Sequence, residues 1–225
     1  VGEEGTEIVR AAKNPDPEEL KYELADWLYH AMVLMVEKGV TWEDITKEIS
    51  QRQINWRKLA LDDEILLSVE HPERYIGGEV NSVMKDRKTE IRYAICFPDV
   101  YEIGMSHLGI QILYSMFNAR PDVWCERVYS PWTDLDKIMR DKHIPLFALE
   151  SQDPIREFDF LGFTIQFEMC YSNILQILDL SGIPLYARDR TEADPIVIGG
   201  GPCTYNPEPV ADFFDIIYIG EGEMQ

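Results

Sequence analysis

IRYAICF, residues 91–97, is a short run of β-branched and aromatic side chains that predicts a strand. Similar runs occur at residues 160–166, 195–199 and 216–220. Helical patterns lie between them, at residues 108–117, 135–142 and 173–180. Strands that alternate with helices in this way indicate right-handed βαβ units and a parallel sheet. We therefore expect a Rossmann-like or flavodoxin-like α/β domain with a mostly parallel sheet over residues 73–225.

Three loops are expected beyond the carboxyl ends of these strands, where open α/β sheets bind ligands. PDVYEIG occupies residues 98–104, GGGP residues 199–202 and GEGE residues 220–223. Glycine lets a backbone approach a ligand closely, or adopt positive φ in a tight turn. Taken alone, each of these loops is more typical of a structural turn than of a ligand site. No Walker loop or G-x-G-x-x-G pattern occurs. The candidate cofactor-binding residues are Gly199, Gly200, Gly201, Gly220, Glu221 and Gly222.

Three segments together carry a resemblance: RYIGGE at residues 74–79, FPDVYEIGMSHLG at residues 97–109, and the stretch from GGGP to GEGE. Over about residues 65–225 the chain resembles the N-terminal domain of a radical SAM family with a cobalamin-binding-type fold. The resemblance implies an iron-sulfur cluster on a C-x-x-x-C-x-x-C motif, and S-adenosylmethionine, in a downstream core that this chain does not contain. Cobalamin is suggested for the α/β domain. The D-x-H-x-x-G pattern that supplies a histidine ligand to cobalamin is incomplete here, because SHLG at residues 106–109 has neither the aspartate nor the right spacing. His107 is therefore expected to start a helix.

The first fifty residues have a helical pattern. Residues 3–13 predict a helix that ends at Asn14-Pro15, because proline disfavours helical geometry in the residue before it. DPEE, residues 16–19, supplies an N-cap, a proline at the first helical position and acids in the first turn. A second helix is therefore expected to run to about Lys38 and to end at Gly39.

Thr41 and Asp44 approximate a capping box, which predicts a third helix to about residue 52. Residues 53–72 include an acid-rich helical stretch, show no core pattern of their own, and are expected to be a connector. The fold class expected for the whole chain is an α+β composite, in which a short all-α segment, residues 1–52, precedes the α/β domain.

Acidic residues recur at helical spacing in the first two predicted helices. Glu23 and Asp26 project side by side, one turn apart. Glu4 and Glu7 have the same spacing, with Glu3 adjacent. If the two helices pack antiparallel, these carboxylates converge, and such a cluster is costly to desolvate unless a cation neutralises it. Mg²⁺ is the natural cation, since it prefers oxygen ligands and keeps positions open for phosphates; the alternative is a solvated acidic face.

GEEGTE at residues 2–7, AAKN at residues 11–14 and YELADWLYH at residues 22–30 resemble phosphoribosyl-ATP pyrophosphohydrolase of histidine biosynthesis. This family belongs to the all-α NTP pyrophosphatase superfamily, whose motif is E-E-x-x-E followed by E-x-x-D. The resemblance implies Mg²⁺-dependent hydrolysis of phosphoribosyl-ATP to phosphoribosyl-AMP and pyrophosphate, in a homodimer. It covers residues 1 to about 52 and lacks the family's preceding helical segment. The implied metal ligands are Glu4, Glu7, Glu23 and Asp26, with Glu3 as a further ligand or an acid that positions water.

Three further residues are candidate substrate contacts. Lys13 and Asn14, at the end of the first predicted helix, could face the substrate phosphates, although a lysine there also favours a helix C-terminus. His30 could contact the substrate, but a histidine in this setting is more often a core residue with its hydrogen bonds satisfied. These three residues are therefore predicted substrate-binding residues with structural alternatives.

Composition restricts the partners and the compartment. A formal net charge of −20 argues against nucleic acid, because phosphate binding needs Lys and Arg. The four cysteines are far apart, without zinc or iron-sulfur spacing, which suggests free thiols in a reducing cytoplasm. The apolar stretch at residues 31–36 is far below the roughly 18 residues that a membrane helix needs, so we expect a soluble protein.

The two ends of the chain bear on completeness. The chain begins at Val1 inside a helical pattern and stops at Gln225 straight after GEGE, so we expect both pieces to be incomplete. Three hypotheses follow: a magnesium-dependent pyrophosphohydrolase module, a binding module that positions cobalamin or a substrate for a radical SAM core, and an assembly or truncation product without activity.

Overall fold

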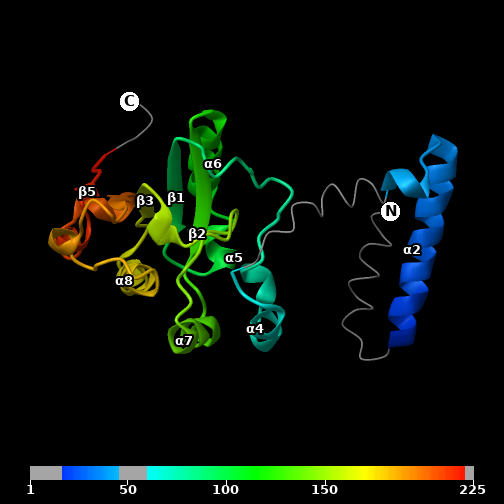
Figure 1. Ribbon diagram of the computed structural model, residues 1–225, viewed down its shortest axis with the longest axis horizontal. Helices are drawn as coiled ribbons and strands as arrows, with labels where there is room; N and C mark the ends of the chain where they lie inside the picture. Colours follow the sequence, from blue (N-terminus) through cyan, green and yellow to red (C-terminus); the bar gives the residue numbers. More distant parts are fainter. Residues whose placement is uncertain (1–16, 46–59, 221–225) are drawn as a thin grey trace. The chain divides into compact units, whose positions relative to one another are not determined.

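A computed structural model describes residues 17–45 and 60–220. The chain divides into two compact units, residues 1–56 and residues 57–225 (Figure 1). We call the first the helical unit and the second the α/β unit. The expected α+β composite, with an all-α segment before an α/β domain, is confirmed.

The helical unit is described over one long helix, α2 (Pro17–Lys38), and the start of the next helix. Gly39 ends α2 with a φ of +66°, in the left-handed region that glycine adopts easily. Thr41 N then donates to the Asp44 carboxylate (2.8 Å), and Asp44 N donates to the Thr41 hydroxyl (3.1 Å). This reciprocal pair confirms the predicted capping box. The helix predicted at residues 3–13 lies outside the described residues.

Five parallel strands form the sheet of the α/β unit (Figure 1). They are β1 (Ile91–Phe97), β2 (Val123–Tyr129), β3 (Phe160–Thr164), β4 (Ile196–Gly200) and β5 (Ile216–Ile217). Their order is β2-β1-β3-β4-β5, the flavodoxin-like order of a doubly wound fold. The mostly parallel sheet is therefore confirmed, with β2 as a strand that the sequence did not predict.

Helices connect the strands. The longer ones are α6 (Leu108–Ala119), α7 (Thr133–Lys142) and α8 (Tyr171–Leu180), close to the predicted ranges. Shorter helices are α4 (Asp63–Ser68) and α5 (Tyr101–Gly104), with single 3-10 turns η1 (Pro72–Arg74), η2 (Ile155–Glu157), η3 (Glu168–Cys170), η4 (Ala187–Asp189), η5 (Pro202–Tyr205) and η6 (Ala211–Phe213).

Alternation along β1 divides the core between the two faces of the sheet. Ile95 and Phe97 pack with α6 on one face, whereas Ala94 and Cys96 belong to the core that includes α7 and α8 on the other. The chain therefore leaves the neighbouring strands β1 and β3 toward opposite faces. Their diverging loops mark the topological switch point, the usual ligand position in this fold.

The stretch before the sheet corrects one expectation. Residues 53–72 were expected to be a connector without a core pattern, but Leu61, Ile65 and Val69 are at least 94% buried in the core of the α/β unit. Asp62 caps α4 by accepting a hydrogen bond from Ile65 N (2.8 Å). The acids of this stretch lie on the outer side of a helix whose other side is part of the core.

Candidate functional sites

The acidic pair predicted for the helical unit lies on α2. Glu23 and Asp26 are three residues apart, so their side chains project from neighbouring positions on the helix surface. Glu23 is partly buried, and the Asp26 side chain is 49% exposed. The Asp26 side chain is therefore open to solvent, beside a partly buried Glu23.

His30 lies one turn after Asp26. Its Nδ1 is 3.0 Å from the backbone oxygen of Asp26 and 3.8 Å from the Asp26 carboxylate. The His30 side chain is 49% exposed, which corrects the alternative that it is a core histidine. The ring lies beside Asp26 of the acidic pair.

The remaining residues predicted for this site lie outside the described residues; they are Glu3, Glu4, Glu7, Lys13 and Asn14. Within residues 17–45 and 60–220, no group of three or more His, Cys, Asp or Glu side chains is placed to hold a metal ion. Glu23 and Asp26 fit the donor chemistry of Mg²⁺. The convergence of four carboxylates stays a prediction.

In the α/β unit, two of the predicted glycines serve close packing. Gly201 has a φ of +105°, and a Cβ at this position would lie 2.8 Å from the backbone oxygen of Ile165. Gly199 packs against the Phe214 ring, where a Cβ would meet two ring carbons at 3.1 Å. The loop after β4 can therefore run beside the backbone that follows β3 only because Gly201 has no side chain.

The other described glycines at this edge leave open space. A Cβ at Gly200 or Gly220 would meet no atom within 4 Å. Gly220 has a φ of +130°, which also favours glycine. Glu221 and Gly222 lie outside the described residues. Neither Gly200 nor Gly220 is therefore required by close packing at its position.

His107 has the structural role that the sequence predicts. It is the N-cap of α6, and its Nδ1 accepts a hydrogen bond from Ile110 N (3.3 Å). Its ring lies 5.2 Å from that of Phe97. His107 therefore starts α6, as the sequence predicts.

The unpredicted strand β2 carries two charged residues that are buried in ion pairs. Arg127 donates through Nε to Glu150 (2.7 Å) and through Nη2 to Glu79 (2.7 Å). Burial raises the pKa of Glu150. Burial also opposes ionisation of Glu79, but the hydrogen bonds from Arg127 outweigh it and hold the pKa of Glu79 below its usual range. Arg127 therefore links the segments that carry Glu79 and Glu150 to strand β2.

A parallel network lies around the neighbouring residue of β2. Glu126 is fully buried, and its carboxylate accepts hydrogen bonds from Arg92 Nη2 (2.5 Å) and Ser151 N (2.8 Å). The Arg92 guanidinium lies 4.1 Å above the centre of the Phe158 ring. Burial raises the pKa of Glu126. These paired charges have a structural role, because these hydrogen bonds join segments of the same unit, although Arg92 Nε is buried without a hydrogen-bond partner among the described residues.

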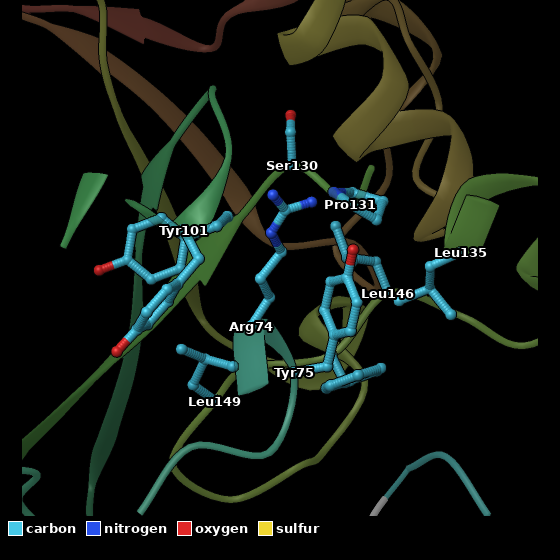
Figure 2. A pocket seen from close by; sticks show the side chains of 10 residues that line it. Arg74, Tyr75, Tyr101, Ser130, Pro131, Leu135, Leu146 and Leu149 are labelled. Carbon is cyan, nitrogen blue, oxygen red and sulfur yellow. The ribbon is translucent and has the colours of Figure 1, made fainter. Parts of the chain in front are cut away.

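A small cavity lies at the carboxyl end of β2, and sequence patterns did not reveal it. Its volume is about 20 Å³, and Figure 2 shows the residues around it. Its polar lining residues are Arg74, Tyr75, Tyr101, Tyr129 and Ser130, and the remaining walls are apolar. The hydroxyl groups of Tyr129 and Ser130 are buried without a hydrogen-bond partner. Two segments singled out in the sequence reach this cavity: RYIGGE at residues 74–79 contributes Arg74 and Tyr75, and PDVYEIG at residues 98–104 contributes Tyr101.

The cysteines agree with the predicted free thiols. All four are unpaired, and three of them, Cys96, Cys125 and Cys170, are buried. Burial raises the pKa of each of these three thiols.

No helix among residues 17–45 and 60–220 has the length and apolar character needed to cross a membrane.

Comparison with known proteins supports both resemblances. The family model for phosphoribosyl-ATP pyrophosphohydrolase matches residues 1–53. Over 53 residues the chain is 55% identical to phosphoribosyl-ATP pyrophosphatase of Lactiplantibacillus plantarum, covering 24% of this chain and 50% of that protein. Over 54 residues it is 57% identical to a histidine biosynthesis bifunctional protein of Oceanobacillus iheyensis, covering 24% and 25%. The chain thus spans half or less of these curated relatives.

The α/β unit has its own relatives. The chain is 28% identical over 133 residues to an uncharacterized protein of Methanocaldococcus jannaschii, covering 58% of this chain and 24% of that protein. No solved structure matches. The family model described as radical SAM proteins, N-terminal, matches residues 109–225, a later start than the expected residue 65. Because this match covers just over half of the chain, the chain belongs to the radical SAM proteins through their N-terminal domain.

Proposed function

We propose that the helical unit hydrolyses phosphoribosyl-ATP to phosphoribosyl-AMP and pyrophosphate in a Mg²⁺-dependent reaction. The observation that carries this proposal is the pair of carboxylates, Glu23 and Asp26, one turn apart on α2. The pair lies inside the segment that is 55% identical to a phosphoribosyl-ATP pyrophosphatase. The order and spacing of the acids match the E-E-x-x-E and E-x-x-D motifs.

The acidic residues and the substrate contacts have different proposed roles in this reaction. Glu4, Glu7, Glu23 and Asp26 would hold the cation, and Glu3 would add a ligand or position the attacking water. Mg²⁺, when bound, screens the phosphate charge and activates water for attack on the α-β phosphoanhydride. The substrate contacts proposed for the phosphates and the nucleoside are Lys13, Asn14 and His30. Exposure of Asp26 and His30 on the same stretch of α2 supports access of a substrate.

We propose a homodimer through the helical unit. Several large apolar side chains of α2 are 39–73% exposed: Tyr22, Trp27, Leu28, Tyr29, Met32 and Leu34. A helix with apolar residues around it favours burial against other helices. A second copy would cover this surface and bring two acidic sites into one assembly. The net charge of −20 supports a partner other than nucleic acid, and the unpaired thiols support a cytoplasmic location.

Pyrophosphate release from phosphoribosyl-ATP, measured with and without Mg²⁺, tests the hydrolase. Asp26→Asn and Glu23→Gln should lower the rate by about 100-fold or more, because the cation contributes several kcal/mol of transition-state stabilisation. Glu37→Gln is the matched control, since Glu37 is an exposed acid on the same helix. Equal rates in all three variants would remove the assignment.

A second candidate function concerns the α/β unit, which we propose holds a ligand at the carboxyl edge of its sheet for radical SAM chemistry. The open space at Gly200 and Gly220 favours this role. The iron-sulfur cluster and S-adenosylmethionine would belong to a separate core, since the cysteines of this chain are too far apart for the cluster motif. Because the D-x-H-x-x-G pattern is incomplete around His107, a substrate fits better than histidine-ligated cobalamin. An absorbance titration with hydroxocobalamin tests this choice: spectral changes would favour cobalamin.

A further inference from the structure

The two faces of the sheet in the α/β unit are covered unequally. The larger buried core lies on the face that carries α7 and α8, and it includes residues of β1, β3 and β4. The other face carries α6, which packs on β1 and β2 (Figure 1). Within residues 17–45 and 60–220, the buried cluster around α6 includes no residue of β3, β4 or β5. The described helices therefore leave these three strands uncovered on the α6 face.

Apolar side chains occupy the uncovered part of this face. Side chains alternate along a strand, and Leu161 and Val197 belong to the larger core. Phe160, Ile196 and Ile198 adjoin them along β3 and β4, so their side chains point to the α6 face. Ile196 is 42% exposed, and Phe160 and Ile198 are only partly buried. Two neighbouring strands therefore present aromatic and aliphatic groups to solvent.

Strand β5 continues this apolar surface to the edge of the sheet. Ile216 pairs with Ile198 in the parallel register, and the next residue, Ile217, packs against the larger core. Ile216 therefore points to the α6 face as well, where it is 50% exposed. We call Phe160, Ile196, Ile198 and Ile216 the bare sheet face.

A bare face of this kind is unusual in a parallel sheet. Sheets in which all strands are parallel occur almost only where helices cover both faces. Neighbouring strands lie about 4.8 Å apart, so three strands span about 10 Å, which is the diameter of one α-helix. A strand of five residues is about 17 Å long, and a helix of about 11 residues has the same length. One helix of ordinary length therefore has the size needed to cover the bare sheet face.

We propose that the bare sheet face is the docking surface for one amphipathic helix, supplied by the chain that follows the N-terminal domain in radical SAM proteins. The family model that matches residues 109–225 is described as N-terminal. In the Methanocaldococcus jannaschii relative the matched region is 24% of the protein, so that relative has ample further chain. The docked helix should carry aliphatic residues at three- and four-residue spacing on the side that meets the sheet.

The position of β5 favours this occupant over an unrelated partner. β5 is the last strand of the sheet, and the chain leaves it at the carboxyl edge, where Gly220 has a φ of +130°. A segment that starts at this edge can return along the bare sheet face antiparallel to the strands, as connecting helices do in this class of fold. The inference rests on the family match, and on neither the hydrolase nor a ligand at the carboxyl edge.

Hydrogen exchange measured by mass spectrometry on the full chain tests the proposal. The probes are synthetic peptides of about 25 residues, long enough for one such helix with flanking residues. Together they tile the region that follows the matched segment in the Methanocaldococcus jannaschii protein. One of them should bind and slow exchange in β4 and β5 by about tenfold or more at saturation, with exchange in β2 unchanged. A shuffled peptide of the same composition is the control for non-specific apolar binding.

Variants locate the bound helix. Ile216→Asp should raise the Kd of the peptide by about tenfold or more, because the helix would bury a charge. Ile216→Thr keeps a β-branched residue in the strand and should raise the Kd by about threefold or more, because it removes apolar surface that the helix covers. Ile112→Asp is the matched control and should leave the Kd unchanged. Ile112 is also 50% exposed, but it lies two positions from Ile110 and Tyr114, which pack on the sheet, so it points away from the sheet.

Three results would overturn the proposal. The first is that no peptide slows exchange in β4 and β5. The second is an equal Kd for the wild type and Ile216→Thr, a comparison that remains decisive if Ile216→Asp fails to fold. The third is protection of β4 and β5 that rises with the concentration of this chain alone, which would assign the bare sheet face to a second copy.

Discussion

Replacing Gly201 with alanine should destabilise the carboxyl edge of the sheet. Gly201 has φ +105° and ψ 178°, a region that residues with a side chain rarely adopt. The added Cβ would lie 2.8 Å from the backbone oxygen of Ile165 and 2.9 Å from its nitrogen. Backbone atoms cannot rotate away as a side chain can. The variant must therefore separate the loop after β4 from the chain after β3.

The expected cost follows from the contacts that separate. Strain at a backbone conformation of this kind costs about 1–3 kcal/mol. Ile165 N donates to Gly200 O (2.7 Å), and Cys203 N donates to Ile165 O (3.1 Å). Each of these hydrogen bonds contributes about 0.5–1.5 kcal/mol. The free energy of opening at this edge should fall by about 2–6 kcal/mol in total.

Hydrogen exchange measured by mass spectrometry on peptides from β3 and β4 gives this free energy directly. Gly200→Ala is the matched control, because a Cβ there meets no atom within 4 Å. Its effect should stay within about 1 kcal/mol, and could be stabilising, since alanine loses less backbone entropy in a strand. If the two variants exchange alike, the close approach of the backbones is not what requires glycine at position 201.

Three further predictions concern the buried charges and the thiols. Glu126→Ala should lower the free energy of unfolding of the α/β unit by about 1–3 kcal/mol in urea denaturation, because Arg92 loses a charge-assisted hydrogen bond but keeps its ion pair with Asp153 (3.1 Å). Glu79→Gln should lower the free energy of unfolding by about 1–3 kcal/mol at pH 7. Because the pKa of Glu79 is lowered in the folded state, the ionised carboxylate stabilises the fold above the unfolded-state pKa of about 4.3. The difference in stability between the wild type and Glu79→Gln should therefore disappear as the pH falls from about 4.3 through the lower, folded-state pKa. A thiol reagent at pH 8 should modify Cys203, which is partly exposed, before the three buried cysteines, and equal rates would contradict this.

The prediction of the fold from sequence succeeded where local pattern and burial agree. β1 coincides with its predicted range, and α6, α7 and α8 begin within two residues of theirs. β2 was missed because Glu126 and Arg127 interrupt an apolar run. Their partners lie 23 or more residues away in the sequence, so the pairing that makes a buried strand of these charges has no local signal.

The stretch around α4 was misjudged for a related reason. Its acids suggested a connector, although Leu61, Ile65 and Val69 recur every four residues and could have indicated a buried helix face. The Arg74 cavity could not be predicted without β2, since Tyr129 and Ser130 reach it from the end of that strand. Motif spacing located Glu23 and Asp26 correctly on one helix, because helical spacing alone determines their separation.

The central claim is that carboxylates of the helical unit bind the Mg²⁺ that phosphoribosyl-ATP hydrolysis requires. The measurement is the rate of pyrophosphate release over a Mg²⁺ titration, in the wild type and in Asp26→Asn. Loss of one carboxylate ligand should move the half-saturating Mg²⁺ concentration upward by about tenfold or more, with a lower maximal rate. Superimposable titration curves, or hydrolysis that proceeds without Mg²⁺, would contradict the claim.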